Sequence, residues 1–282
     1  MQKLWINGQS ESDLQGKHCN AFDRGMAYGD GLFATMRIDS HGQIQFLDTH
    51  IQRLTQAAFR LNIKVDQQYW SPNSALLEHL KEVSLQHPLQ GLKLLITRGV
   101  GGRGYQAPDS SSVTELVSVF PLPEQYSNWQ KQGIKLQSSA IKLAKQPILA
   151  GMKHLNRLEQ VMIKSQSLSE GFQDWLVMDT DDMVIESSMA NIFFHDGEKW
   201  LTPCLSKSGV SGVMREQVIQ RLLESGEHVE VQSIPKEKFQ HMQHSFITNS
   251  LMGVVDIVQI DDKVFDKSSI TETLRSQLGV SL

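Results

Sequence analysis

The stretch AGMKHLNRLE, residues 150–159, decides how the rest of the chain is interpreted. It places Lys153 just ahead of an amphipathic run. Apolar residues recur through this run at near-helical spacing, at Leu155, Leu158, Val161, Met162 and Leu168. The spacing predicts a helix that buries this face, with Lys153 at its first turn or just before it. A partly desolvated lysine there has a disfavoured ammonium, so its amine becomes available to react with a carbonyl. Most lysines are simply solvated, so whether Lys153 is reactive has to be judged from the other residues of the chain.

The composition is that of an ordinary globular protein. The 282 residues, 40% of them hydrophobic and 21% charged, are enough for two cores, so two domains are expected. A net charge of -4 with interspersed signs argues against a nucleic-acid or anionic-membrane partner. Cys19 and Cys204 form no CxxC motif, which is typical of a reducing compartment. The N-terminus lacks the apolar core of a signal peptide and no run approaches a membrane span, so we expect a cytoplasmic protein.

The first 120 residues mix strand and helix patterns. Strands are expected at 3–6, 32–38, 44–47, 91–97 and 113–120, the second and third forming a hairpin, with a polar loop up to Asp23. Asp48 is expected to cap a helix that buries Ile51, Leu54, Ala58 and Leu61, and a second helix covers 75–86.

A proline-rich interruption, PLPEQ at 121–125, predicts a linker over 121–130 between a smaller domain, 1–120, and a larger one, 131–282. The second half predicts strands at 133–139, throughout 175–202, and at 228–231, 245–249 and 254–260. Helices are expected after Lys153, after Gly212 and from about 268. This mixture predicts two domains of the α/β or α+β class.

Two glycine-rich turns lead into different kinds of segment. Gly99–Gly104 matches G-x-G-x-x-G, but no helix pattern comes after it, so a dinucleotide site is not expected. The turn either carries Arg103 and Tyr105 into a site or is a plain glycine-rich turn. Residues 209–214 do lead into a helix, whose first backbone N–H groups could receive a phosphate. Alternatively, Ser211 simply caps that helix.

Glu186 comes after the apolar residues 183–185 at a strand end. Alone it would be a surface acid, whereas paired with a buried cation it would be functional. His241 and His244 have no acidic or cysteine ligands nearby, so no metal site is expected. The chain contains neither a G-x-S-x-G elbow nor a Walker loop, which weakens hydrolase and nucleotide-hydrolase interpretations.

A reactive lysine, a phosphate-receiving helix start, an arginine and a carboxylate are together what pyridoxal 5'-phosphate requires. Over nearly its whole length the sequence resembles the fold-type IV pyridoxal-phosphate enzymes, the family of branched-chain and D-amino-acid aminotransferases. Within that family it most resembles the aminodeoxychorismate lyases. Six ordered blocks carry the resemblance: DRG with GDG within 23–31, HIQRL at 50–54, RGVGGRGY at 98–105, 151–158, ESSMAN at 186–191 and GVSGVMR at 209–215.

The resemblance implies a role for each matching residue. Lys153 would hold the cofactor covalently and later move protons, and Glu186 would face the pyridine nitrogen. The phosphate would be held by Arg53, the backbone of Val213 and Met214, and the hydroxyl of Ser250. The loop with Arg103 and Tyr105 would reach across from a partner subunit to trap a substrate carboxylate, which implies a homodimer.

At two positions the chain departs from the aminotransferase pattern, and these positions indicate which branch of the family it resembles. Aminotransferases commonly have an acidic residue where this chain has Ala34 and a threonine where it has Met214, and here both are replaced as in the lyases. Losing a carboxylate suits an anionic substrate, Thr35 adds a neutral catalytic hydroxyl, and Phe33 would contact the substrate. The resemblance implies conversion of 4-amino-4-deoxychorismate to 4-aminobenzoate and pyruvate for folate synthesis. The alternatives are an aminotransferase of the same fold and a cofactor-free binding protein, which would have no reason to keep Lys153.

Overall fold

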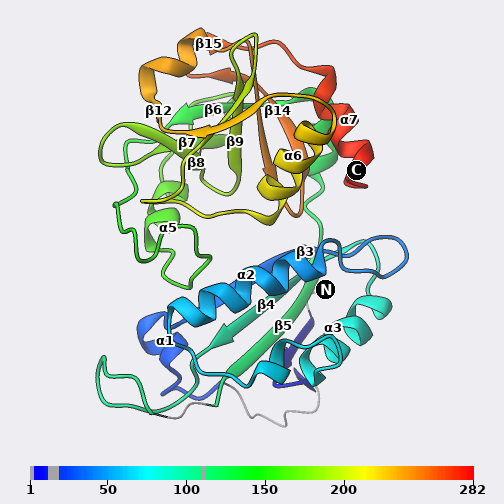
Figure 1. The fold of residues 1–282 in the computed structure, drawn as a ribbon, viewed down its shortest axis with the longest axis vertical. Helices are drawn as coiled ribbons and strands as arrows, with labels where there is room; N and C mark the ends of the chain where they lie inside the picture. Colours follow the sequence, from blue (N-terminus) through cyan, green and yellow to red (C-terminus); the bar gives the residue numbers. More distant parts are fainter. Residues whose placement is uncertain (1–2, 12–18, 110–111) are drawn as a thin grey trace. The chain divides into compact units, whose positions relative to one another are not determined.

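The structure is a computed structural model that describes residues 3–11, 19–109 and 112–282, and its chain forms two compact units (Figure 1). Unit 1 contains Met1–Leu122 and Met152–Asn156, and unit 2 contains Pro123–Gly151 and Arg157–Leu282. Residues 125–130 of the expected linker belong to a helix, α4 (Gln125–Gln132). The segment Met152–Asn156 belongs to unit 1 although unit 2 residues flank it on both sides.

Unit 1 is built on a five-stranded antiparallel sheet in the order β2-β1-β5-β4-β3. Its strands are β1 (Lys3–Ile6), β2 (Gln9–Ser10), β3 (Gly31–Arg37), β4 (Gln90–Thr97) and β5 (Thr114–Pro121). Figure 1 shows α2 (Leu47–Arg60) lying along this sheet, with α3 (Ala75–Gln86) beside it. The buried side chains of α2 include Ile51, Leu54 and Ala58, as its apolar spacing predicts. A short 3-10 helix, η2 (Gln67–Trp70), connects the two helices.

Three local expectations in unit 1 are wrong. The strand expected at 44–47 is reduced to one bridge between Ile38 and Ile44, because Phe46 takes a positive φ of 54° and α2 begins at Leu47. Asp48 therefore lies in the first turn of α2 and is not its cap. The loop expected up to Asp23 contains β2, and α1 (Arg24–Tyr28) begins directly after it, capped by the Asp23 side chain. Residues 12–18 of that expected loop lie outside the described residues.

Unit 2 contains a ten-stranded sheet in which six strands pair in a closed ring: β9, β13, β14, β6, β7 and β8. Their bounds are β6 (Ile134–Ser138), β7 (Asp174–Met178), β8 (Met183–Ser187), β9 (Asn191–His195), β13 (His244–Asn249) and β14 (Gly253–Ile260). A single residue pair, Glu186 with Asn191, joins β8 to β9 and closes the ring. A large apolar cluster that includes Ile134, Leu176, Ile192 and Ile257 fixes these strands.

The other elements of unit 2 extend or cover this ring. The remaining strands are β10 (Trp200–Pro203), β11 (Val229–Gln232), β12 (Ile234–Pro235) and β15 (Lys263–Val264). Helix α6 (Val213–Glu224) packs against β13, and α4 and α7 (Ser269–Gln277) pack against β14. The 3-10 helix η3 (Lys236–His241) comes after β12. Within the described ranges, no helix combines the length and apolar character needed to span a bilayer.

The helix expected at or directly after Lys153 begins later in the chain. Helix α5 (Leu158–Lys164) begins five residues after Lys153, and its buried anchor is Ile163, which packs in a cluster with Trp175. The side chains expected to be buried, Leu158, Val161 and Met162, are 50–70% exposed in the single chain. The apolar spacing therefore marks a helix correctly, but the apolar face is not covered by unit 2.

Candidate active site

Lys153 is held in an extended segment alongside β3. Phe33 donates its backbone N–H to the carbonyl of Lys153 over 3.0 Å, and Leu155 donates to Gly31 over 3.0 Å. Leu32 and His154 form the bridge between these two bonds. These bonds keep the segment extended, so Lys153 is not in the first turn of a helix but lies five residues ahead of α5. The Lys153 Nζ atom lies 4.5 Å from the centre of the Phe33 ring.

Two basic side chains, Arg53 and Lys153, act electrostatically on a buried histidine of α2. His50 is fully buried. Burial, together with the charges of Arg53 and Lys153, holds its pKa well below the ordinary value of 6.5. His50 is therefore neutral near pH 7, and two cations act on it. The sequence resemblance assigned Arg53 and Lys153 to one cofactor, and their positive charges suit an anion.

The alternation of β3 separates the expected substrate residues from Ala34. Phe33 and Thr35 point to one face of the strand, and the fully buried Ala34 points to the other. A carboxylate at position 34 would therefore lie in the interior of unit 1. Lys93 stands opposite Thr35 on β4, and its Nζ atom lies 4.9 Å from the centre of the Phe33 ring. The sequence interpretation missed Lys93, although a lysine inside the apolar run 92–96 was the signal.

Glu186 is buried at the closing contact of the β-ring in unit 2. It is 6% exposed, so it is not a surface acid, and its Oε2 atom accepts the Val210 backbone N–H over 3.0 Å. Arg157 is a second residue that the sequence interpretation missed. Burial lowers the pKa of Arg157, whereas the negative charges of Glu186 and Glu159 raise it. A carboxylate and a guanidinium thus lie close together within unit 2.

The turn 209–212 is fixed by the residues around it. Gly209 has a φ of +81°, and a Cβ atom there would lie 2.6 Å from Ile185 Cγ2, so glycine is required. Asn191 donates from Nδ2 to the Val210 carbonyl over 2.8 Å, and its Oδ1 atom accepts the Gly212 N–H over 3.1 Å. Gly151 donates to Gly209 and accepts from Ser211, each over 3.0 Å. The two residues that close the β-ring therefore also hold this turn.

Helix α6 begins at this turn without a side-chain cap. Its N-cap is Gly212, so Ser211 does not have the capping role that the sequence left open. Val213 and Met214, both buried, supply the first backbone N–H groups of the helix, and the positive end of the helix dipole lies there. Such a helix start is suited to bind a phosphate. Ser250 lies in the turn after β13, whose Asn249 side chain accepts the N–H groups of Leu251 and Met252.

Each unit, described by itself, contains residues of the kinds that pyridoxal phosphate requires. Unit 1 supplies the Lys153 amine and the cation of Arg53, and unit 2 supplies the buried Glu186 carboxylate and the start of α6. The residues fit the cofactor.

The loop with Arg103 and Tyr105 lies on the surface of unit 1. Arg103 pairs with Gln106 across a tight turn, and Tyr105 is 90% exposed. No helix comes after the glycines among residues 105–109 or 112–120, so the geometry of a dinucleotide site is absent from these residues.

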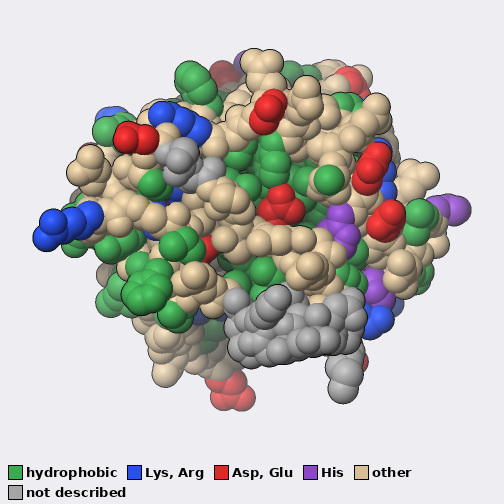
Figure 2. All heavy atoms as spheres, turned by 90° about the horizontal axis from the view of Figure 1, so that it is seen from below, with side chains coloured by type: hydrophobic (Ala, Val, Ile, Leu, Met, Phe, Trp, Pro, Cys, Tyr) green, Lys and Arg blue, Asp and Glu red, His purple; other side chains and the backbone are tan. Residues whose placement is uncertain are grey.

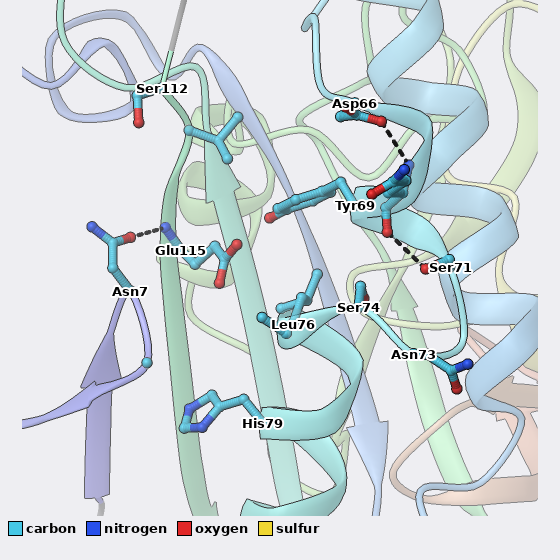
Figure 3. A pocket seen from close by; sticks show the side chains of 14 residues that line it. Asn7, Asp66, Tyr69, Ser71, Asn73, Ser74, Leu76, His79, Ser112 and Glu115 are labelled. Atoms are coloured by element: carbon cyan, nitrogen blue, oxygen red, sulfur yellow. Dashed lines mark hydrogen bonds between the residues drawn. The ribbon is translucent and has the colours of Figure 1, made fainter.

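A pocket of about 900 Å³ in unit 1 does not match the expected site (Figure 3). Its lining includes the acids Asp66 and Glu115 and the imidazole of His79, but none of its described lining residues is a lysine or arginine. Burial, together with the charge of Glu115, raises the pKa of Tyr69, so its hydroxyl stays protonated. This lining does not suit a substrate with carboxylates.

The described residues contain no group of three or more histidine, cysteine or carboxylate side chains placed to hold a metal ion. On the face drawn in Figure 2, lysine and arginine side chains are scattered toward the margins and form no continuous patch.

The fold and its similarity to known proteins show a pyridoxal-phosphate enzyme of fold type IV, as the sequence resemblance implied. The sequence pattern of the class IV aminotransferases matches residues 31–260, and the chain belongs to this family. It is 32% identical to the aminodeoxychorismate lyase of Vibrio harveyi, covering 98% of this chain and 99% of that protein.

Two further comparisons are with a lyase and with an aminotransferase. The crystal structure of 4-amino-4-deoxychorismate lyase from Pseudomonas aeruginosa superposes with a TM-score of 0.89 at 30% identity, covering 98% of this chain and 97% of the other. A putative branched-chain aminotransferase of Methanocaldococcus jannaschii is 26% identical, over 96% of this chain and 92% of its own. The predicted fold class is confirmed, and both branches of the family are represented among the relatives.

Proposed function

We propose that the protein is a cytoplasmic pyridoxal-phosphate-dependent lyase that converts 4-amino-4-deoxychorismate to 4-aminobenzoate and pyruvate, a step that supplies folate synthesis. The observation that carries the proposal is full-length similarity at 30% identity or more to lyases of this name. The site residues support it because each chemical task in the reaction has a candidate among them.

When bound, the cofactor supplies an electron sink for the carbon that bears the substrate amine. Lys153 Nζ takes the proton from that carbon. The Glu186 carboxylate, which its burial and its bond to Val210 keep in one orientation, would hold a proton on the pyridine nitrogen. The neighbouring carbon then releases the enolpyruvyl oxygen, and the ring becomes aromatic. We assign Thr35 to the proton transfers that accompany this release, since it shares a face of β3 with Phe33.

The anionic groups are assigned to separate cations. Arg53, the first N–H groups of α6 and the Ser250 hydroxyl hold the cofactor phosphate. The substrate has two carboxylates, one on the ring and one on the enolpyruvyl group. Lys93 beside Phe33 and Arg103 on the exposed loop are assigned to them, with Tyr105 completing the loop contact.

The protein is proposed to act as a homodimer in which Arg103 serves the partner's site. Phe22, Met26 and Tyr105 in unit 1 are 74–90% exposed, and α5 in unit 2 exposes Leu158 and Val161. Hydrophobic groups also stand out on the surface in Figure 2. Exposed apolar groups of this size are typical of protein interfaces.

Mixed dimers test this assignment. Combining Arg103→Ala subunits with Lys153→Ala subunits restores one complete site in each mixed dimer, which gives about a quarter of wild-type activity for random association. Recovery of nothing beyond the separate mutants would show that Arg103 does not act across the dimer.

Capture of the cofactor tests the enzyme class. Borohydride treatment of the loaded protein is expected to remove its near-visible absorbance band and to add the reduced cofactor to the peptide that contains Lys153. Lys153→Ala should have neither the band nor the adduct. A protein that takes up no cofactor on reconstitution would be a binding protein with this fold.

An aminotransferase is the second candidate, since relatives of that name share the fold. The replaced residues Ala34 and Met214 favour the lyase. A lyase needs no keto-acid acceptor, whereas an aminotransferase depends on one, so turnover without a keto acid separates the two.

A further inference from the structure

The buried side chain of Arg24 donates hydrogen bonds to the loop that contains Arg103. Its Nη1 atom donates to the carbonyls of Gly101, Gly104 and Gln106 over 3.3, 3.1 and 3.2 Å. Its Nη2 atom donates to the Tyr105 carbonyl over 3.1 Å. Arg24 is 4% exposed, whereas the loop it holds is at the surface. One guanidinium thus ties four carbonyls of a glycine-rich turn together from the inside.

Arg24 is itself fixed from three directions. Its Nε atom donates to Asp30 Oδ2 over 2.9 Å, and its backbone N–H donates to the Gly99 carbonyl over 2.9 Å. Its guanidinium carbon lies 4.9 Å from the centre of the Tyr28 ring, and that ring packs against Tyr105 at 5.5 Å. Arg24 therefore holds the backbone of the loop directly, and it contacts the Tyr105 side chain through Tyr28.

Arg98 binds the same carboxylate but holds a different segment. It donates to both oxygens of Asp30, over 2.7 and 3.0 Å, and to the carbonyls of Leu61 and Asn62. Of the two guanidiniums on Asp30, Arg24 is the one that contacts the carbonyls of residues 101–106. Arg98 is therefore a matched control.

We infer that Arg24 is a positioning residue that sets the conformation of the 101–106 loop, and through it the affinity for the substrate carboxylate that Arg103 binds. The effect on substrate affinity rests on the proposed function, whereas the effect on the loop conformation does not. Glycines at 99, 101, 102 and 104 make the free loop costly to order, so a pre-set conformation lowers the cost of binding. Lysine cannot replace Arg24, because a single ammonium cannot donate to Asp30 and to four separate carbonyls.

Hydrogen exchange of the loaded wild-type enzyme and of Arg24→Lys tests the structural part. We expect amide exchange in peptides covering 100–107 to rise by about tenfold or more in Arg24→Lys. Arg98→Lys should affect residues 61–62 and leave the loop within about twofold of wild type. Unchanged loop exchange in Arg24→Lys, or an equal rise in Arg98→Lys, would overturn the inference.

A double-mutant cycle tests the link to Arg103. In Arg24→Lys, the KM for 4-amino-4-deoxychorismate is expected to rise about 10 to 100-fold, with kcat within about threefold of wild type and an unchanged cofactor spectrum. In an Arg103→Ala background, the same substitution should add almost nothing to KM. Multiplying effects would show that Arg24 acts independently of Arg103. If the wild type does not turn over this substrate, the proposed function fails, and the exchange experiment still decides the role of Arg24.

Discussion

Replacing Gly209 by alanine should weaken cofactor binding through a contact that can be located in advance. The new Cβ atom would lie 2.6 Å from Ile185 Cγ2, 2.9 Å from Leu205 Cδ2 and 3.4 Å from Glu186 Oε2. The turn must move away from β8, which disturbs both the Glu186 bond to Val210 and the start of α6. Glycine is also favoured by the φ of +81°, where an alanine costs about 1–2 kcal/mol.

Gly226→Ala is the matched control, because Gly226 has a φ of +83° but nothing within 4 Å of its added Cβ atom. The two variants therefore share the backbone strain and differ in the clash, which overpacking data place at about 1–3 kcal/mol. If the displaced turn holds the cofactor, this difference raises the Kd for pyridoxal 5'-phosphate by roughly 5 to 150-fold. Titration of the apoproteins, monitored by cofactor absorbance, measures it. Equal Kd values for the two variants would show that the 209–212 turn does not hold the cofactor.

Three further substitutions have defined outcomes. Glu186→Gln should retain the fold and lose most of kcat, since an amide cannot hold the pyridinium proton; normal turnover would mean that another carboxylate has this role. Lys93→Met should raise the substrate KM by about 10 to 100-fold if a charge-assisted contact of about 1.5–3 kcal/mol is lost, with an unchanged cofactor spectrum; an unchanged KM would remove Lys93 from the site. The lowered pKa of His50 means that unfolded chains bind a proton that the folded protein excludes, so the free energy of unfolding should fall as the pH drops below about 6.5. His50→Asn should flatten this dependence in urea titrations, and an equal slope in both proteins would contradict the assignment.

Residue spacing and capping signals correctly predicted the helices and strands that depend on nearby residues. The helix Ala75–Gln86 has the bounds that its spacing predicts, with Ser74 capping it, and the strand patterns around residues 32 and 91 correspond to β3 and β4. These residues combine a clear period with a matching start or stop signal. The family resemblance, which depended on six ordered blocks, also predicted the fold class.

The misplaced elements are those that depend on distant partners. Lys153 is extended because β3, more than a hundred residues away in sequence, offers hydrogen bonds to its backbone. Of the α5 side chains, Ile163 is the buried one and joins the cluster around Trp175, whereas Leu158, Val161 and Met162 stay exposed. A periodic pattern shows that an element is amphipathic, but it does not show which surface covers it.

The site residues that the sequence missed depend on pairing across the sheet or on contacts with a turn. Lys93 becomes a candidate only when β3 and β4 align it with Thr35. Asn191 belongs to the motif that suggested Glu186, but its contacts with the 209–212 turn depend on the closure of the β-ring. Arg24 lies in the DRG motif, and nothing in the sequence indicates that it binds carbonyls near residue 105.

The lyase activity is tested by turnover of 4-amino-4-deoxychorismate by the purified, cofactor-loaded protein with no keto acid present. A lyase should form equal amounts of 4-aminobenzoate and pyruvate over many turnovers, without stimulation by added keto acids, and Lys153→Ala should form no product. Strict dependence on a keto acid, with its conversion to an amino acid, would rule out the lyase assignment and make the protein an aminotransferase.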